Sequence, residues 1–219
     1  MPTADDYRAL LADGTRKGSF AQRARGKRSQ KLIETFPSLG DMNVLDLGGT
    51  PQFWSGFPVR PAHVTLVNLM PVASPADWIT TVTGDACSLT GPIATSTFDL
   101  VVSNSVIEHV GGHVQRQRFA EVVARSADRH WIQTPYRYFP IEPHWLFPCM
   151  QFLPLRARAA ITQHWPLSPG RERNLRDAVA NAASVELLSV TDMRSYFPES
   201  TLWYERFGLL VKSLTAIRC

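Results

Sequence analysis

Five residues that can move protons, bind charge or stack on a ligand occur within a short stretch after the middle of the chain. They are Tyr136, Arg137, Glu142, His144 and Trp145, in a segment held rigid by Pro135, Pro140 and Pro143. Histidine titrates near neutrality, so His144 is the leading candidate for a general base, and Glu142 is placed to orient its ring. The alternative is that His144 packs beside Trp145 as a structural histidine of an ordered loop.

A second group, Asp46, Gly48 and Gly49, follows an apolar, β-branched run at residues 43–47. In an open parallel sheet, ligands bind beyond the carboxyl ends of the strands, and glycines there let the backbone approach a ligand closely. A dinucleotide pyrophosphate fits poorly, because the third glycine of G-x-G-x-x-G is missing and Pro51 lacks an N–H. The pattern therefore predicts a ligand site of another kind.

Alternating strands and helices must position these two groups. Strands are predicted at 43–47, 63–69, 78–82, 97–103 and 129–133, and a helix at 113–126. This alternation indicates a parallel sheet built from βαβ units. Near the C-terminus, residues 185–190 and 209–217 are again predicted as strands.

The segment between the two halves is rich in proline and has little strand character. Helices are predicted there at 155–163 and 171–183. We expect an N-terminal helical cap at 1–40 and one domain at 41–219, with a lid insertion at about 134–184.

Length, charge and cysteine content limit which classes of protein the chain can belong to. The chain has 219 residues and a net charge of +4, and no apolar run long enough to span a membrane. Its cysteines, Cys87, Cys149 and Cys219, are odd in number and far apart, which argues against disulfides. We expect the protein to be located in the reducing cytoplasm. The basic segment 16–31 could be an arm that binds nucleic acid or the solvated face of a helix. We favour the solvated face, because no aromatic residues alternate with the charges. The segment could also fold over a bound ligand as a cap.

Four motifs, taken in order, resemble those of class I S-adenosylmethionine-dependent methyltransferases. They are Val44-Leu45-Asp46-Leu47-Gly48-Gly49, Gly84-Asp85-Ala86, the run from Phe98 to Asn104, and Ile107-Glu108-His109-Val110. The resemblance runs from about Asn43 to the C-terminus. It implies an α/β, Rossmann-like fold with a seven-stranded, mostly parallel sheet, helices on both faces and a lid after the fifth strand. It also implies S-adenosylmethionine as cofactor, bound by Asp46, Gly48, Gly49, Asn68, Asp85, Ala86 and Ser103.

Asn68 is the clearest departure from this family. The family usually has an acid here that binds both ribose hydroxyls, whereas asparagine can bridge a ribose but carries no charge. Asp85 is expected beside the adenine, whose exocyclic amine needs an acceptor. Because Gly49 is expected to face the ligand, Gly49→Val should abolish cofactor binding while leaving the fold intact.

Glu108 and His109 have two alternative roles. The pair closes a loop in many members of the family, but some O-methyltransferases hold a divalent cation at this position with an E-x-x-E-H stretch. Here Ser105 replaces the first carboxylate. Mg²⁺ or Mn²⁺ at Glu108 and His109 is therefore one expectation, and His109 is also the second candidate base.

The "FPIEPHW" stretch resembles bacterial methyltransferases that modify glycans. This implies an oxygen acceptor on a sugar or oligosaccharide, contacted by Tyr136, Arg137, Glu142 and Trp145. Sugars stack on aromatic rings, although Trp145, Tyr136, Tyr138 and Trp165 could instead form a small core under the lid. One alternative is a phenolic or lipid-like acceptor. A nucleic-acid acceptor is a further alternative, although the chain lacks an N-P-P-Y-type motif after the fourth strand. The last is a cofactor-binding module without catalysis. The sequence does not indicate an oligomeric state.

Overall fold

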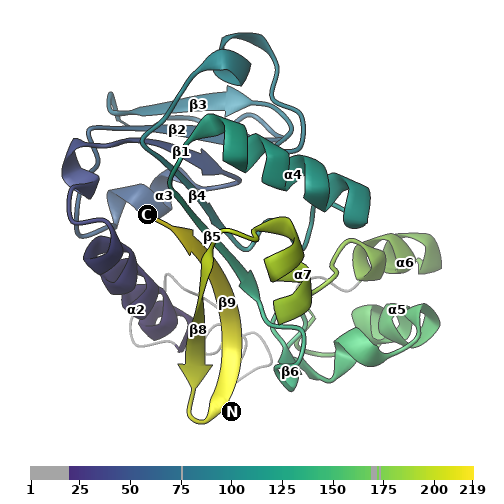
Figure 1. Cartoon of the computed structure of the whole chain (residues 1–219). Helices are drawn as coiled ribbons and strands as arrows, with labels where there is room; N and C mark the ends of the chain where they lie inside the picture. Colours follow the sequence, from purple (N-terminus) through teal and green to yellow (C-terminus); the bar gives the residue numbers. More distant parts are fainter. Residues whose placement is uncertain (1–19, 75, 169–171, 173) are drawn as a thin grey trace.

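A seven-stranded sheet forms the centre of the computed structural model, which describes residues 20–74, 76–168, 172 and 174–219. The strands are β1 (Asn43–Leu47), β2 (His63–Asn68), β3 (Ile79–Thr83), β4 (Leu100–Asn104), β5 (His130–Pro135), β8 (Thr201–Phe207) and β9 (Leu210–Arg218). Their order is β3-β2-β1-β4-β5-β9-β8 (Figure 1). The strands β1 to β5 pair in parallel, whereas β9 is antiparallel to both β5 and β8. The predicted fold class is therefore confirmed.

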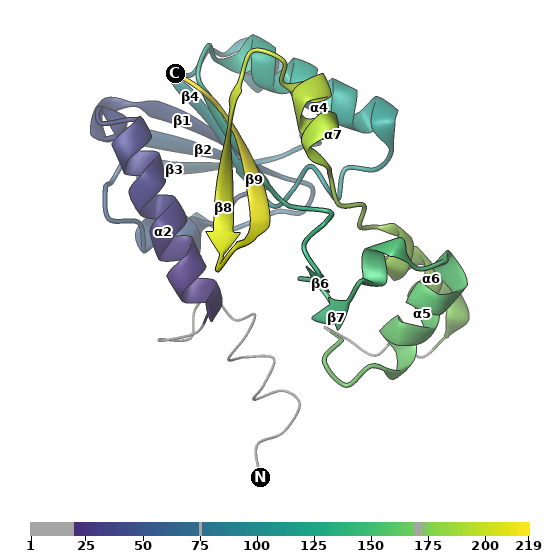
Figure 2. The ribbon, with the colours of Figure 1, turned by 60° about the horizontal axis from the view of Figure 1, so that its bottom comes forward.

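Helices cover both faces of the sheet (Figure 2). On one face lie α4 (His113–Ser126) and α7 (Val190–Tyr196), whose buried Phe119 and Met193 join one core. On the other face lie α2 (Phe20–Thr35) and α3 (Pro51–Ser55), which bury Leu32 and Trp54 in a second core. Short helical turns η1 (Leu39–Asp41) and η2 (Gly91–Thr95) complete the connections. This arrangement leaves the carboxyl ends of β1 and β4 side by side, where the strand order reverses.

The segment after β5 leaves the sheet and forms a small unit of its own (Figure 2). It contains β6 (Ile141–Glu142), β7 (Phe147–Pro148), η3 (Met150–Phe152), α5 (Leu155–His164) and α6 (Leu175–Ala183). Its own small core includes the buried Trp145, Met150, Val185 and Leu187. We call residues 136–187 the lid segment.

Two predicted elements differ from the structure. Residues 185–190 are not a strand: they form one isolated bridge, between Leu188 and Tyr136, and a backbone hydrogen bond from Glu186 to Glu108, and α7 begins at Val190. Val185 and Leu187 are buried in the small core of the lid segment and Leu188 in the core of the sheet, which explains the strand-like pattern. The strand β8 was not predicted at all. The predicted helix at 171–183 begins at Leu175, after Asn174 caps it by accepting a hydrogen bond from the Asp177 N–H.

The basic segment lies only partly within the described residues. From Phe20 onward it is the helix α2, as expected, and residues 16–19 lie outside the described part of the chain. Within that part, no helix is long and apolar enough to cross a membrane.

Candidate cofactor and active site

Asp46 is the buried acid at the carboxyl end of β1. Its side chain is 1% exposed, and its Oδ2 accepts a hydrogen bond of 2.7 Å from the indole Nε1 of Trp54 in α3. Burial raises the pKa of Asp46 to about 7, and the bond from Trp54 offsets this only in part. Trp54 was not predicted as a site residue, although it lies only eight residues after Asp46 in the sequence.

The two glycines after Asp46 are required by contacts within the protein. Gly48 has φ +80°, and a Cβ atom there would lie 2.5 Å from Cγ2 of Val106. A Cβ atom at Gly49 would lie 1.7 Å from Oδ2 of Asp46. The expectation that Gly49→Val leaves the fold intact therefore needs correction, because any side chain at this position must displace the carboxylate of Asp46.

Asn68 has a defined role at the end of β2. Its Nδ2 donates a hydrogen bond of 2.9 Å to the carbonyl oxygen of Gly49. An aspartate cannot donate this bond. The amide therefore holds the glycine turn in place, which gives a physical reason for the departure from the family's usual acid.

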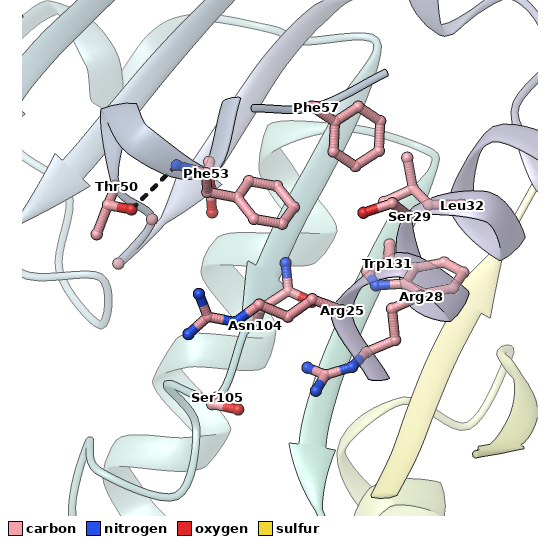
Figure 3. A pocket seen from close by; sticks show the side chains of 13 residues that line it. Arg25, Arg28, Ser29, Leu32, Thr50, Phe53, Phe57, Asn104, Ser105 and Trp131 are labelled. Atoms are coloured by element: carbon pink, nitrogen blue, oxygen red, sulfur yellow. Dashed lines mark hydrogen bonds between the residues drawn. The ribbon is translucent and has the colours of Figure 1, made fainter. Parts of the chain in front are cut away.

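Two cavities meet at this edge of the sheet. The larger, of about 430 Å³, is lined by Gly48, Val67, Asn68, Leu69, Met70, Val72, Gly84, Asp85, Ala86, Ser105, Val106, His109 and Val110. The smaller, of about 180 Å³, is lined by Arg25, Arg28, Ser29, Leu32, Asp46, Gly48, Gly49, Thr50, Phe53, Phe57, Asn104, Ser105 and Trp131 (Figure 3). Both linings include Gly48 and Ser105, so the cavities adjoin there.

The predicted cofactor residues divide between these cavities, with one exception. Asn68, Asp85 and Ala86 line the larger cavity, and Asp46 and Gly49 line the smaller one. Ser103 is in neither lining: it is buried, and its hydroxyl donates a hydrogen bond of 2.8 Å to the carbonyl of Leu47. This bond ties β4 to β1.

A partly buried polar network borders the smaller cavity and was not predicted. The Oε1 of Gln133 accepts hydrogen bonds from the hydroxyl of Ser105 and from Arg28 of α2, at 3.1 and 2.9 Å. The Nε of Arg28 also lies 3.1 Å from the buried carboxylate of Glu205. Burial lowers the pKa of Arg28, and Glu205 opposes that effect. The network fixes α2 over the sheet edge.

His109 and His144 form a pair beside the larger cavity. Their Nε2 atoms lie 3.1 Å apart, and their rings meet edge to face. The Nδ1 of His144 lies 2.6 Å from Oε1 of Glu142. His109 lines the larger cavity, and the tertiary structure brings His144, 35 positions later in sequence, and its neighbour Glu142 in behind it.

Glu108 is buried next to this pair. One of its oxygens accepts a hydrogen bond of 2.9 Å from the hydroxyl of Thr134. Burial raises the pKa of Glu108 to about 7, and nearby His144 lowers it in part. Potential ligand atoms of Glu108, His109 and His144 all lie within 4.8 Å of one another, a spacing that could hold a metal ion.

The predicted acceptor-binding residues have different surroundings. Tyr138 is 60% exposed and its ring lies 5.5 Å from that of Tyr136. Arg137 lines a separate cavity of about 310 Å³ in the lid segment. Trp145 is 1% exposed and Glu142 is buried, so both support the lid segment from within.

The fold is that of class I S-adenosylmethionine-dependent methyltransferases. A methyltransferase from Mesorhizobium loti that depends on S-adenosylmethionine has a similar structure, with a TM-score of 0.55 and 16% identity over 90% of this chain and 98% of that one. The N-methyltransferase NodS from Bradyrhizobium japonicum, in complex with S-adenosylhomocysteine, has a TM-score of 0.51 and 13% identity, over 89% and 87%.

A third structure is similar as well. An O-methyltransferase family protein from Burkholderia thailandensis has a TM-score of 0.51 and 11% identity, over 99% of this chain and 63% of that one. No protein-family model and no curated protein sequence matches the chain. At these identities the likeness is one of fold.

Proposed function

We propose that this protein is an S-adenosylmethionine-dependent O-methyltransferase that acts on a hydroxyl of a sugar or oligosaccharide. The observation that carries this proposal is the position of the histidine pair: His109 lines the larger cavity, and His144 contacts His109. A proton acceptor therefore adjoins the space where the resemblance expects the cofactor.

The polar groups at the cavity walls support a cofactor site that extends over both cavities. Asp85 and Asn68 at the larger cavity suit the adenine and ribose, whose amine and hydroxyls are hydrogen-bonding groups. Asp46 at the smaller cavity suits the ammonium of the methionine portion. The residues that would hold the two ends of the cofactor therefore flank the junction of the cavities at Gly48 and Ser105.

The reaction needs alignment and one proton transfer. S-adenosylmethionine held by Asp46, Asn68 and Asp85 would supply an electrophilic methyl group and a neutral thioether as leaving group. The hydroxyl proton passes to Nε2 of His144. Glu142 supports this role, because a carboxylate at Nδ1 assigns the ring proton there and leaves Nε2 as the acceptor.

The acceptor class rests on the exposed rings of the lid segment. Tyr138 is exposed, and it stacks on Phe152 with ring centroids 5.8 Å apart. Flat C–H faces of a sugar ring can pack on such a surface, and Arg137 can donate to its hydroxyls. The buried Trp145 and Glu142 act from behind by holding this segment and His144 in place.

The test is a binding measurement followed by an activity screen. Calorimetry should show binding of S-adenosylhomocysteine, and a panel of oligosaccharides should include an acceptor that gains a methyl ether, detected by mass spectrometry. A phenol or lipid-like alcohol methylated in place of every sugar would support the alternative acceptor class. Cofactor binding without turnover on any acceptor would support a non-catalytic module.

A metal-dependent mechanism is the second candidate, favoured by the close approach of Glu108, His109 and His144. An ion bound there would occupy Nε2 of His144, so the two mechanisms exclude each other. Two imidazoles suit Zn²⁺, whereas the carboxylate together with water ligands suits Mn²⁺ or Mg²⁺. Loss of turnover after EDTA and its return with one of these ions would support the metal, whereas full activity after EDTA would support the histidine as base without a metal ion.

A further inference from the structure

The smaller cavity has an excess of positive charge. Two arginines of α2, Arg25 and Arg28, line it together with one acid, Asp46. Arg28 is already paired, because its guanidinium contacts Glu205 and Gln133. Its charge is therefore balanced within the protein.

Arg25 differs from Arg28 in its surroundings. It lies three residues earlier on α2, is exposed, and forms no ion pair with any residue that the structure describes. Figure 3 shows its side chain extending into the cavity, whereas the guanidinium of Arg28 points in another direction. The Arg25 charge also disfavours the charge on Arg28. An anion bound at Arg25 would relieve that repulsion.

Asp46 supplies the complementary group in the same cavity. Its Oδ2 is bound to Trp54, but its Oδ1 is buried and has no hydrogen-bond partner among the described residues. Among the described residues, the cavity thus presents one carboxylate oxygen and one guanidinium that have no hydrogen-bond or ion-pair partner. A ligand with an ammonium and a carboxylate on the same carbon, an α-amino acid group, fits this pair of opposite charges.

We propose that Arg25 binds the α-carboxylate of the cofactor's methionine portion while Asp46 binds its ammonium. This inference rests on the proposed function and extends it to α2, which becomes part of the cofactor site. The nucleoside occupies the larger cavity, and the amino-acid end passes Gly48 and Ser105 into the smaller one. Recognition of the carboxylate then depends on a helix that precedes the sheet in sequence.

The experiment compares two ligands that differ in the amino-acid end. S-adenosylhomocysteine carries the α-amino acid, whereas 5′-methylthioadenosine has the same nucleoside thioether and lacks it. Arg25→Ala should lower the affinity for S-adenosylhomocysteine by about 10- to 100-fold, as measured by calorimetry, because a hydrogen-bonded charge pair is lost. Affinity for 5′-methylthioadenosine should change less than about twofold. Arg25→Lys, which keeps the charge and loses the planar fork, should give an intermediate value.

Lys27→Ala is the matched control, because Lys27 lies exposed on the same helix and lines neither cavity. It should leave both affinities unchanged. Equal affinity of wild type and Arg25→Ala for S-adenosylhomocysteine would overturn the inference, as would an equal loss for both ligands, which would mean that Arg25 acts on the helix and not on the carboxylate. A folded wild-type protein that binds neither ligand would overturn the proposed function as well, and so the two failures are distinguishable.

Discussion

The carboxylate of Glu142 holds His144 at two points. Oε1 lies 2.6 Å from the ring Nδ1, and Oε2 accepts a hydrogen bond of 2.8 Å from the backbone N–H of the same residue. The backbone N–H of Trp145 donates to Oε2 as well, at 2.9 Å. One buried acid therefore fixes both the ring and the backbone of His144, which leaves Nε2 directed toward His109.

His144→Ala should lower kcat by about 10² to 10⁴, which is the usual contribution of a positioned general base. The affinity for S-adenosylhomocysteine should stay near that of wild type, since His144 lines neither cavity. Steady-state kinetics at saturating acceptor, with calorimetry on the same preparations, measure both quantities. His164→Ala, at the exposed end of α5, is the matched control and should be silent.

A second variant decides between the two histidines. If His144→Ala retains near-normal turnover, His109→Ala should carry the loss instead, because His109 is the residue of the pair that lines the cavity. Normal turnover in both variants would mean that catalysis depends on alignment alone and that the general-base mechanism is wrong.

Asp46→Asn should make the protein more resistant to unfolding than wild type as pH rises, while it weakens cofactor binding. Burial raises the pKa of Asp46 from 3.8 to about 7, so between these values the folded state holds a proton that the unfolded state has released. The stability from this proton is fully present below pH 3.8 and is lost progressively as pH rises to about 7, by up to about 4 kcal/mol in all. The variant stays neutral and escapes this loss.

Urea unfolding at pH 5 and pH 8 measures the effect. The wild type should lose stability relative to Asp46→Asn between these two values, and groups common to both proteins, such as Glu108, cancel in the difference. The variant should also bind S-adenosylhomocysteine more weakly, because the ammonium loses its charged partner. A pH-independent difference in unfolding free energy would show that Asp46 is ionised throughout.

Asn68→Asp should destabilise the protein without ligand, even though it restores the residue usual in the resembled family. The bond from Nδ2 to the Gly49 carbonyl is lost, and a carboxylate then faces that carbonyl oxygen. We expect a loss of about 1 kcal/mol or more in the free energy of unfolding, measured in denaturant above pH 6. Unchanged stability would mean that the bond contributes nothing to holding the glycine turn.

Gly49→Val should destabilise the fold as well as abolish cofactor binding. The added side chain meets the carboxylate of Asp46, and overpacking of this kind costs about 1–3 kcal/mol. Gly112→Ala is the control, because a Cβ atom at Gly112 would meet no atom within 4 Å. Thermal unfolding of the two variants should show a large shift for the first and little for the second. A wild-type melting temperature in Gly49→Val would contradict the packing role.

Much of the sheet could be predicted from the sequence because its signals are local. The strand at 43–47 and the helix at 113–126 agree with β1 and α4 residue for residue. The strands predicted at 63–69, 78–82 and 129–133 differ from β2, β3 and β5 by one or two residues at their ends. Buried parallel strands read as short apolar runs between turns, and such a pattern depends on neighbouring residues alone.

The sequence by itself also determined which chemical groups reach the sheet edge. Asp46 was named from its place at the end of a predicted strand and Glu142 with His144 from the segment after one, whereas Asn68 and Asp85 were named from the resemblance to methyltransferase motifs. The same reasoning failed at 185–190, where burial against Trp145 and Met150, and not a partner strand, explains the apolar pattern.

The tertiary structure alone decided which of these groups meet. Nothing local in the sequence joins Asp46 to Trp54, Arg28 to Glu205, or His109 to His144, because each contact closes over a turn, a helix or a whole sheet. The pairs depend on how α2, α3 and the lid segment pack on the sheet. Hydrogen bonds and ion pairs act over about 3 Å, whereas sequence patterns specify only period and burial, so the partners of a buried charge emerge only when the layers are in place.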